Sequence, residues 1–351
     1  MSYNKKKPFT DLTEFHNNSN SVETNTSKKK SLNNIREPVE QHLTEFKAFY
    51  KDALKTDVFL LDQIVRYLLR QQGKELRPTL VFLTARMFGE INNRSYIAAT
   101  MVELLHAATL IHDDVVDDAD KRRGFLSINR VWKNKASVLL GDFLLSRGLL
   151  ISLDNDEFKL LKVLSKAVKS MSEGELRQLK ASKLLKMNEE RYFKIISEKT
   201  ASLIAACCEC GAISTTDDDH IQKTMHEIGI KIGIAFQIRD DLFDYGIDDV
   251  GKPKYNDIKD RKITLPLIKA FDNASSVDKW KMRRLLKKNS KSQSDISSLV
   301  TLVTKYEGIG YAKKMMYSYT EKAKKQLNEL NQADHKNNFE ELINYIINRK
   351  K

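Results

Sequence analysis

Residues that interrupt helices are scarce in this chain of 351 amino acids, which contains 5 prolines and 13 glycines. No stretch alternates polar and apolar side chains as a half-exposed β-strand would. Leu, Ile, Lys and Glu dominate the composition, which favours helices, and 41% of the residues are hydrophobic, enough for a sizeable core. These features exclude a strand-and-turn architecture and predict an all-α fold.

Cysteine is also scarce, and the three cysteines, Cys207, Cys208 and Cys210, all lie in one apolar helical stretch. No histidine is nearby, and their spacing matches no zinc-binding pattern. We therefore expect buried free thiols, which suit a reducing compartment.

An apolar signal region is missing from the first part of the chain. Residues 1–36 are rich in Lys, Asn, Ser and Thr and show no hydrophobic periodicity, so they are predicted to form a disordered arm. Residues 37–351 are predicted to form a single helical domain. We expect a cytoplasmic location; a mitochondrial one is the alternative if the arm is a transit peptide.

Long uncharged apolar runs are lacking as well. The most apolar run, Ser137–Leu153, contains Asp142 and Arg147, so it is predicted to be a helix buried in the protein and not a membrane span. The net charge is +13, from 60 basic and 47 acidic residues. Because the basic residues are interspersed with acidic ones, we interpret the charge as favouring solubility and anionic substrates over nucleic acid.

Two acidic clusters carry the strongest functional signal. Five of the eight residues from 113 to 120 are acidic, and Asp113 and Asp117 share one helix face; Asp240 and Asp244 repeat that spacing. Such pairs repel each other by roughly 0.2–0.5 kcal/mol, whereas a hard divalent cation reverses the penalty. Solvated helix ends are the alternative. The predicted Mg²⁺ ligands are Asp113, Asp114, Asp117, Asp240, Asp241 and Asp244.

Cations near these clusters suggest the ligand. Lys74 and Arg77 flank a predicted helix start at Pro78, a ready anion site. No P-loop or kinase-type glycine-rich motif is present, so nucleotide phosphoryl transfer lacks its usual cradle. Chemistry in which a metal-bound diphosphate is the leaving group remains. Further cations are Arg122, Arg123, Lys199 and Lys252.

Seven motifs then occur in order: GKELRP, LLHAATLIHDDVVDDADKRRG, EGELRQ, KTA, FQIRDDLFDY, GKPKYND and ITLP. Over roughly residues 38–325 they resemble the trans-isoprenyl diphosphate synthases, the polyprenyl synthetase family, and most of all its bacterial long-chain members. The resemblance implies an isoprenoid-synthase-type helical bundle around a central cavity, usually a homodimer. It implies repeated condensation of isopentenyl diphosphate onto a farnesyl- or geranylgeranyl-type allylic diphosphate, for a quinone side chain. The implied cofactor is Mg²⁺, three ions per site, with Mn²⁺ as a substitute.

The same resemblance implies roles for individual residues. Asp113, Asp117 and Asp240 match the family's metal ligands, and Asp114, Asp241 and Asp244 complete the motifs. Arg122, Lys199 and Lys252 match residues that hold the allylic diphosphate. Lys74, Arg77, His106 and Arg123 match those that hold isopentenyl diphosphate. Thr200 and Gln237 match polar groups near the developing cation. In place of the family's usual Gly-Lys before TLP stand Arg261 and Lys262, which keep a cation there.

Product length is expected to depend on the helix before the first cluster. Ala108 and Thr109 lie five and four residues before Asp113, and one helical turn of about 5.4 Å is comparable to an extended isoprene unit. Small residues there leave room for a long product, hexaprenyl to octaprenyl. The expected floor of the tunnel lies around Met101, Val102 or Leu105.

Alternative functions differ in the motifs that they need. A short-chain geranylgeranyl or farnesyl diphosphate synthase would share all of them. A class I terpene cyclase usually carries an Asn/Ser/Glu metal set in place of Asp240 and Asp241, and a non-catalytic subunit of a heteromeric synthase loses its aspartates. A nucleic-acid-binding helical protein fits least well. Peripheral contact with a membrane is expected only for product release.

Overall fold

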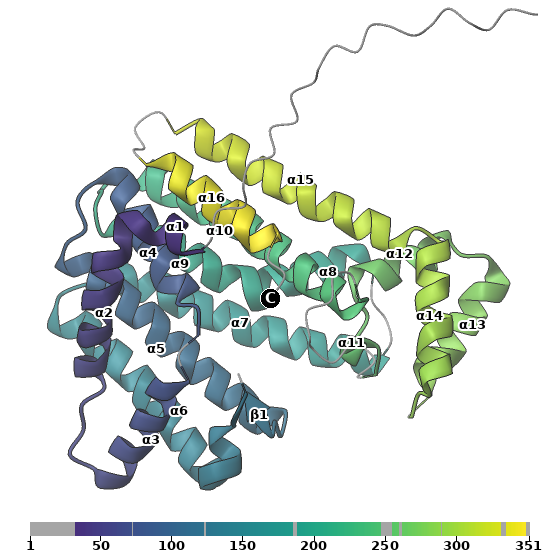
Figure 1. Ribbon diagram of the computed structural model, residues 1–351, viewed down its shortest axis with the longest axis horizontal. Helices are drawn as coiled ribbons and strands as arrows, with labels where there is room; N and C mark the ends of the chain where they lie inside the picture. The colour runs from purple at the N-terminus through teal and green to yellow at the C-terminus, as the bar shows by residue number, and fades with distance from the viewer. Residues whose placement is uncertain are drawn as a thin grey trace, which may run out of the picture.

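The computed structural model describes residues 32–71, 73–122, 124–184, 188–246, 255–259, 262–288, 290–330 and 335–348. Nearly all of them are helical (Figure 1), which confirms the all-α fold. In order, the elements are α1 (Leu32–Arg36), η1 (Glu37–Val39), α2 (Glu40–Ala53), α3 (Phe59–Arg70), α4 (Leu76–Phe88), α5 (Asn93–Val116), β1 (Lys121–Arg122), β2 (Phe125–Leu126), α6 (Ile128–Asp154), α7 (Phe158–Leu184), α8 (Glu189–Ile196), η2 (Ser197–Ala201), α9 (Ser202–Ile213), α10 (Asp219–Asp244), α11 (Asn256–Lys259), α12 (Leu265–Asn273), α13 (Ser276–Lys287), α14 (Gln293–Lys305), α15 (Gly308–Asn328) and α16 (Lys336–Asn348).

Helix α9 lies inside the bundle and contacts α4, α5, α7 and α10. Nearly all of its side chains are buried, as expected for a helix that is apolar on every side. Cys207, Cys208 and Cys210 are free and buried, as predicted. Burial raises the pKa of each thiol, so these cysteines serve packing and are poor nucleophiles.

Small residues bring α10 unusually close to α9 and η2. A Cβ atom on Gly229 would lie 2.5 Å from the Cα of Ala205, and one on Gly233 would lie 2.4 Å from the Cα of Ala201. Both distances are far below van der Waals contact, so only glycine fits at these two positions. The close crossing sets η2, a turn of π-helix, directly against the helix that carries the second acidic cluster.

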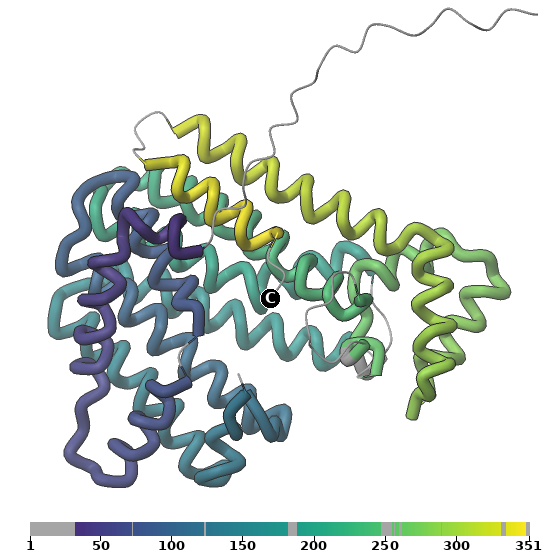
Figure 2. The backbone as a smooth tube through the Cα atoms, viewed as in Figure 1, coloured from purple at the N-terminus to yellow at the C-terminus, as the bar shows by residue number. Residues whose placement is uncertain are grey.

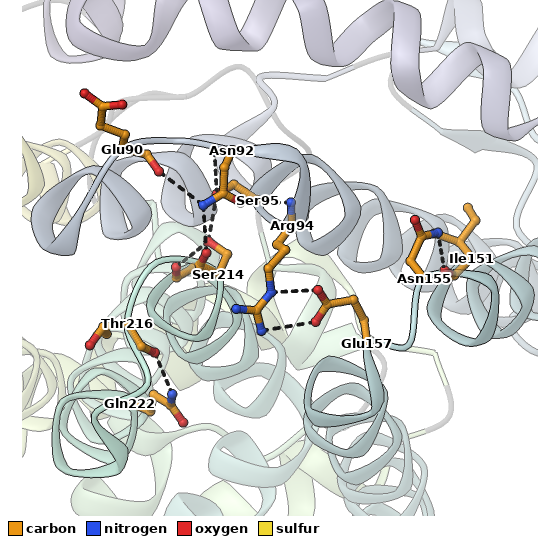
Figure 3. A network of polar contacts seen from close by, with 11 residues as sticks. Glu90, Asn92, Arg94, Ser95, Ile151, Asn155, Glu157, Ser214, Thr216 and Gln222 are labelled. Carbon is orange, nitrogen blue, oxygen red and sulfur yellow. Dashed lines mark hydrogen bonds and ion pairs between the residues drawn. The ribbon is translucent and has the colours of Figure 1, made fainter.

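The N-terminal end of α5 is anchored to two other helices (Figure 3). Asn92 caps the helix, and its Nδ2 donates to the backbone oxygen of Ser214 after α9 (3.0 Å). Arg94 binds Glu157, which precedes α7, through Nε (2.7 Å) and Nη2 (3.3 Å). These contacts hold one end of a 24-residue helix whose other end carries the first acidic cluster.

The predicted N-terminal arm is too long at its C-terminal end. Leu32–Arg36 forms helix α1, and Ile35 is buried in the core. Helix α1 contacts α16, which also covers α4 and α10. The backbone trace shows purple α1 and yellow α16 next to each other (Figure 2). Helix α1 buries a single apolar residue, Ile35, and one residue is too few to produce a detectable hydrophobic periodicity. Residues 1–31 lie outside the described part of the chain.

The prediction that the run Ser137–Leu153 is buried is wrong for one face of α6. The helix packs along α5, and Arg147 Nε donates to the backbone oxygen of Ala53 (2.6 Å). By length and composition α6 could cross a membrane, which alone is weak evidence, and 28% of its most apolar window is buried. Apolar composition predicts burial but not which partner provides it. The exposed apolar residues of this face are Val138, Leu139, Leu149, Leu150 and Leu153.

Candidate active site

The first acidic cluster lies at the C-terminal end of α5. Asp114 is buried and accepts a hydrogen bond from Arg122 Nε (2.7 Å), and Arg122 Nη2 lies 2.5 Å from the same carboxylate oxygen. Arg122 belongs to β1, so the β1–β2 hairpin folds this cation back onto the helix end. Asp114 and Arg122, which are eight residues apart in sequence, therefore form an ion pair. Asp117 is exposed next to them.

Asp113 lies in a crowded acidic environment. Burial, the carboxylate of Glu175 and that of Asp117 raise the pKa of Asp113, while Lys199 and Arg122 oppose the rise. A carboxylate with a raised pKa binds protons more readily, because the folded protein stabilises its charge poorly. Additional positive charge at this point would therefore stabilise the cluster.

The ammonium of Lys199 forms an ion pair with Glu175 of α7. The approach is close because Gly174 precedes Glu175: a Cβ atom on Gly174 would lie 2.7 Å from the backbone nitrogen of Lys199. Sequence reasoning named the motif EGELRQ but assigned no role to Glu175. A glycine between two glutamates inside a helix was the available signal, since glycine there is unfavourable without a packing reason.

The second acidic cluster takes part in a chain of hydrogen bonds. Thr200 Oγ1 donates to Gln237 Oε1 (2.8 Å), and Gln237 Nε2 donates to Asp241 Oδ1 (2.9 Å). The hydroxyl of Tyr192 donates to Asp241 Oδ2 (2.6 Å). The predicted pair Thr200 and Gln237 is thus brought together, and Gln237 lies one helical turn before Asp240 and two turns before Asp244. Tyr192 was not predicted, because a lone tyrosine before the KTA motif has no sequence signature.

Lys262 neutralises this second cluster. Its ammonium lies 3.7 Å from Asp241 Oδ1 and 3.3 Å from Asp257 Oδ1, and these acids raise the pKa of Lys262 despite its burial. Burial raises the pKa of Asp241 to about 6, although Lys262 opposes the rise. With two carboxylates beside one ammonium, Lys262 stays charged. Asp257, which sequence reasoning missed, also donates its backbone N–H to Asp244 Oδ2 (3.1 Å).

A pocket of about 730 Å³, including its open mouth, brings His106, predicted to hold isopentenyl diphosphate, together with residues of the first acidic cluster. His106, Asp114 and Arg122 line it together with Gly73 and Glu75 of the GKELRP loop. Next to this loop, Lys74 Nζ lies 3.0 Å from the hydroxyl of Tyr345 in α16, and Arg77 is half-buried at the start of α4. Arg123 and Lys252 lie outside the described residues.

A second pocket, of about 800 Å³ with its mouth, is mainly apolar and lies between α5, α6 and α7. Met101 and Leu105, two of the predicted floor residues, line it. Ala108 is fully buried in the core, and Thr109 Oγ1 donates to the backbone oxygen of His106 (2.9 Å). The remaining lining residues are Leu144, Leu145, Gly148, Leu149, Leu161, Leu164, Ser165, Val168 and Lys169.

The acidic clusters do not form a closed metal site in the described part of the chain. Among the described residues, no group of three or more His, Cys, Asp or Glu side chains is gathered closely enough to hold an ion. Asp114 is bound by Arg122. Asp241 is bound by Tyr192, Gln237 and Lys262. Oxygen-only donors nevertheless suit a hard divalent cation, and burial together with the neighbouring carboxylates of Glu175 and Asp117 raises the pKa of Asp113. The donor chemistry therefore fits Mg²⁺, provided that carboxylates move toward the ion.

Known proteins resemble this chain over most of its length. The family model described as Polyprenyl synthetase matches residues 58–303. Octaprenyl diphosphate synthase of Escherichia coli (strain K12) is 36% identical over 247 residues, which is 70% of this chain and 76% of that protein. The crystal structure of a decaprenyl diphosphate synthase from Rhodobacter capsulatus matches with a TM-score of 0.85 at 30% identity, covering 91% of this chain and 99% of that one.

A polyprenyl synthase from Caulobacter crescentus CB15, complexed with calcium and isoprenyl diphosphate, matches with a TM-score of 0.83 at 29% identity, covering 92% of this chain and 99% of that one. Other relatives of comparable identity are named geranylgeranyl diphosphate synthases. The similarity spans the GKELRP loop and both acidic clusters, and it extends to the complete helical bundle. The chain therefore belongs to the polyprenyl synthetase family, whose members are all-α trans-prenyltransferases.

Proposed function

We propose that this prenyltransferase adds isopentenyl diphosphate repeatedly to an allylic diphosphate with Mg²⁺ as its cofactor, and releases a long all-trans polyprenyl diphosphate. The bond between the allylic carbon and its diphosphate breaks, and that carbon then bonds to the isopentenyl double bond. The proton lost from the adduct passes to the departing diphosphate. One observation carries the proposal: a lysine that a diphosphate can also bind forms an ion pair beside each carboxylate cluster, Lys199 with Glu175 and Lys262 with Asp241.

Substrate binding would exchange these partners. Bound Mg²⁺ would supply the positive charge that neutralises the leaving diphosphate, with Asp113, Asp117, Asp240 and Asp244 as its ligands. Lys199 and Arg122 are then free to bind the oxygens of the allylic diphosphate. Asp114 and Asp241, already engaged by protein groups, orient these groups. The Caulobacter structure, which holds calcium and isoprenyl diphosphate, supports the combination of ligands.

Thr200 and Gln237 would stabilise the developing allylic cation. Gln237 Oε1 accepts a hydrogen bond from the Thr200 hydroxyl, and Gln237 Nε2 donates one to Asp241, so the lone pairs of the Thr200 oxygen remain available. Preorganised dipoles of this kind need no reorganisation when charge develops. The π-helical turn of η2 places Thr200 next to Lys199, so the group near the cation and the group near the diphosphate are consecutive residues.

A long product, of the hexaprenyl to octaprenyl range, is supported by the apolar pocket that begins at Leu105 and Met101. Its lining of leucines and valine excludes water from a growing hydrocarbon chain. A quinone side chain is the use that we propose for such a product. The alternative is a short-chain product, since relatives of comparable identity carry geranylgeranyl names.

We further propose a homodimer that forms through α6. The exposed face of this helix carries five large aliphatic side chains, and between residues 138 and 153 its charges are Asp142 and Arg147. Apolar surface of this extent on a helix that is already bound to the bundle suits a second protein chain. Docking of two α6 faces would also cover Leu149, which lines the apolar pocket.

The decisive experiment is incubation of the purified chain with farnesyl diphosphate, isopentenyl diphosphate and Mg²⁺, followed by mass spectrometry of the products. We expect a series of elongated prenyl diphosphates with a long final member, and none when EDTA replaces Mg²⁺. A twenty-carbon end product would favour the short-chain alternative. A hydrocarbon formed from farnesyl diphosphate alone would identify a terpene cyclase, and no product at all would refute the proposal.

A further inference from the structure

Helix α13 exposes an unusual combination of side chains at one end of the molecule. Figure 1 shows α13 and α14 at the right end of the longest axis, opposite α2 and α3. Val277 and Trp280 are 74% and 62% exposed, although burying either would be favourable. Met282, Leu285 and Leu286 face inward and are buried. The outer face therefore presents apolar and aromatic surface that nothing in the described chain covers.

Cations follow this apolar surface along the same face. Val277, Trp280, Arg284 and Lys287 stand three or four residues apart, so they form one stripe, with Lys281 beside Trp280 and Arg284. The guanidinium of Arg284 lies 5.5 Å from the centre of the Trp280 ring. The cations from residue 276 to residue 288 are Lys279, Lys281, Arg283, Arg284, Lys287 and Lys288.

The one acid of this helix is turned away from the stripe. Asp278 accepts hydrogen bonds from Lys305 Nζ (2.9 Å) and from the hydroxyl of Tyr306 (2.7 Å). Its side chain is mostly covered, and these donors, first of all Lys305, lower its pKa. Asp295 is bound in the same way by Lys288. The outward electrostatic field of α13 is therefore dominated by Lys281, Arg284 and Lys287.

We propose that α13 docks the protein on the surface of an anionic lipid bilayer. A tryptophan ring with one apolar body and one N–H donor suits the level of the lipid headgroups, and lysine and arginine beside it bind the anionic headgroups. The face of α6 differs, because its leucines have almost no cations among them. Apolar surface with cations thus points to lipid at α13, and apolar surface without them points to protein at α6.

The benefit of docking rests on the proposed function, because a long-chain polyprenyl diphosphate is an amphiphile that water solvates poorly. Its diphosphate can stay in the headgroup layer while its hydrocarbon enters the bilayer. Binding to lipid itself requires no turnover. It can therefore be measured whether or not the substrate assignment holds.

The test is sedimentation of the full chain with vesicles of phosphatidylcholine alone and with vesicles that also contain phosphatidylglycerol. We expect binding to the anionic vesicles only. Each surface cation contributes about 1 kcal/mol, or about fivefold in affinity, so the triple variant Lys281→Gln, Arg284→Gln and Lys287→Gln should bind about a hundredfold more weakly. A matched variant, Lys51→Gln, Lys162→Gln and Lys166→Gln, removes the same charge from exposed positions on α2 and α7 and should bind like the parent.

Fluorescence gives an independent readout, because the chain has 2 tryptophans and Trp132 is half-buried against Tyr67. In a Trp132→Phe variant, emission from Trp280 should shift to the blue on anionic vesicles. No binding to these vesicles would overturn the proposal, as would an equal loss in the matched variant, which would show attraction by net charge alone. Binding of single-stranded RNA through α13 in place of vesicles would overturn it as well.

Discussion

The ammonium of Lys74 lies 3.0 Å from the hydroxyl oxygen of Tyr345 and 5.6 Å from the centre of its ring, although 271 residues separate the two in sequence. Helix α16 thus brings a side chain from near the end of the chain to the GKELRP loop. Arg36 of α1 is close to both Glu75 and Tyr345, since both raise its pKa against the effect of burial. The loop is therefore held from its outer side by two terminal helices.

We expect Tyr345→Phe to raise the KM for isopentenyl diphosphate several-fold and to leave kcat nearly unchanged. The phenol positions the Lys74 ammonium, and a hydrogen bond to a charged group contributes roughly 1.5–3 kcal/mol when well formed, less where solvent competes. Steady-state kinetics with each substrate varied in turn would measure this. Tyr317→Phe on the exposed side of α15 is the control. A change in kcat with no change in KM would contradict a positioning role.

Thr200→Val should lower kcat by about a hundred- to a thousandfold, the range seen when one preorganised polar group is removed near a developing charge. Valine keeps the shape of threonine, so KM values should change little. The hydrogen bond to Gln237 (2.8 Å) would be lost with the hydroxyl. Thr301→Val on α14, whose hydroxyl bonds only its own helix at Ser297, is the matched control. If Thr200→Val retained full kcat, the role near the cation would be wrong.

The sequence was sufficient to predict the fold class and both acidic helix faces, because helical periodicity and i, i+4 spacing are local properties. Glu175, Tyr192, Asp257 and Tyr345 were not predicted as partners of the site. Tyr192 and Tyr345 reach it by contacts between segments distant in sequence, and Glu175 and Asp257 reach it through the way neighbouring helices and loops fold back, which composition and spacing do not record. The exposed face of α6 was not predicted for the same reason. An apolar helix indicates that its surface must be covered, but not which element or chain covers it.

Asp113→Asn should abolish most turnover and yet stabilise the protein when Mg²⁺ is absent. The raised pKa of Asp113 means that the folded state binds its proton more tightly than the unfolded state does. The free energy of unfolding therefore falls as pH rises from the unfolded to the folded pKa, and the ionised form destabilises the fold at neutral pH. Thermal unfolding in EDTA should show a higher Tm for the variant.

The control for this prediction is Asp120→Asn, which alters an exposed acid of the same motif whose ion pair with Arg130 is 3.5 Å long. An exposed pair of this kind contributes about 1 kcal/mol or less, so both Tm and turnover should stay close to the parent values. Equal turnover in the Asp113 variant and its control would show that Asp113 is not a metal ligand.

Two substitutions test whether the apolar pocket between α5, α6 and α7 holds the growing product chain. Ala108→Phe should shorten the product, but Ala108 is fully buried, so overpacking should also destabilise the fold by about 1–3 kcal/mol. Gly148→Phe should shorten the product without that penalty, because no described atom beyond the backbone of its own helix lies within 4 Å of a Cβ built there, and the residue lines the apolar pocket. Mass spectrometry of the products would decide. Unchanged long chains from both variants would place the growing chain elsewhere.

Gly233→Ala should impair catalysis through the backbone. The added methyl group would lie 2.4 Å from the Cα of Ala201, so α10 and η2 must separate by roughly 1 Å to reach ordinary contact near 3.5 Å. Lys199 and Thr200 belong to the displaced turn, whereas Gln237 moves with α10, and the hydrogen bond between Thr200 and Gln237 would lengthen. We therefore expect a lower Tm together with a loss of kcat that approaches the loss in Thr200→Val. Gly148→Ala, inside α6 at a position with open space, adds the same methyl group and should leave kcat unchanged without lowering Tm. A Gly233→Ala enzyme with parental kcat would show that the crossing does not set the geometry of the site.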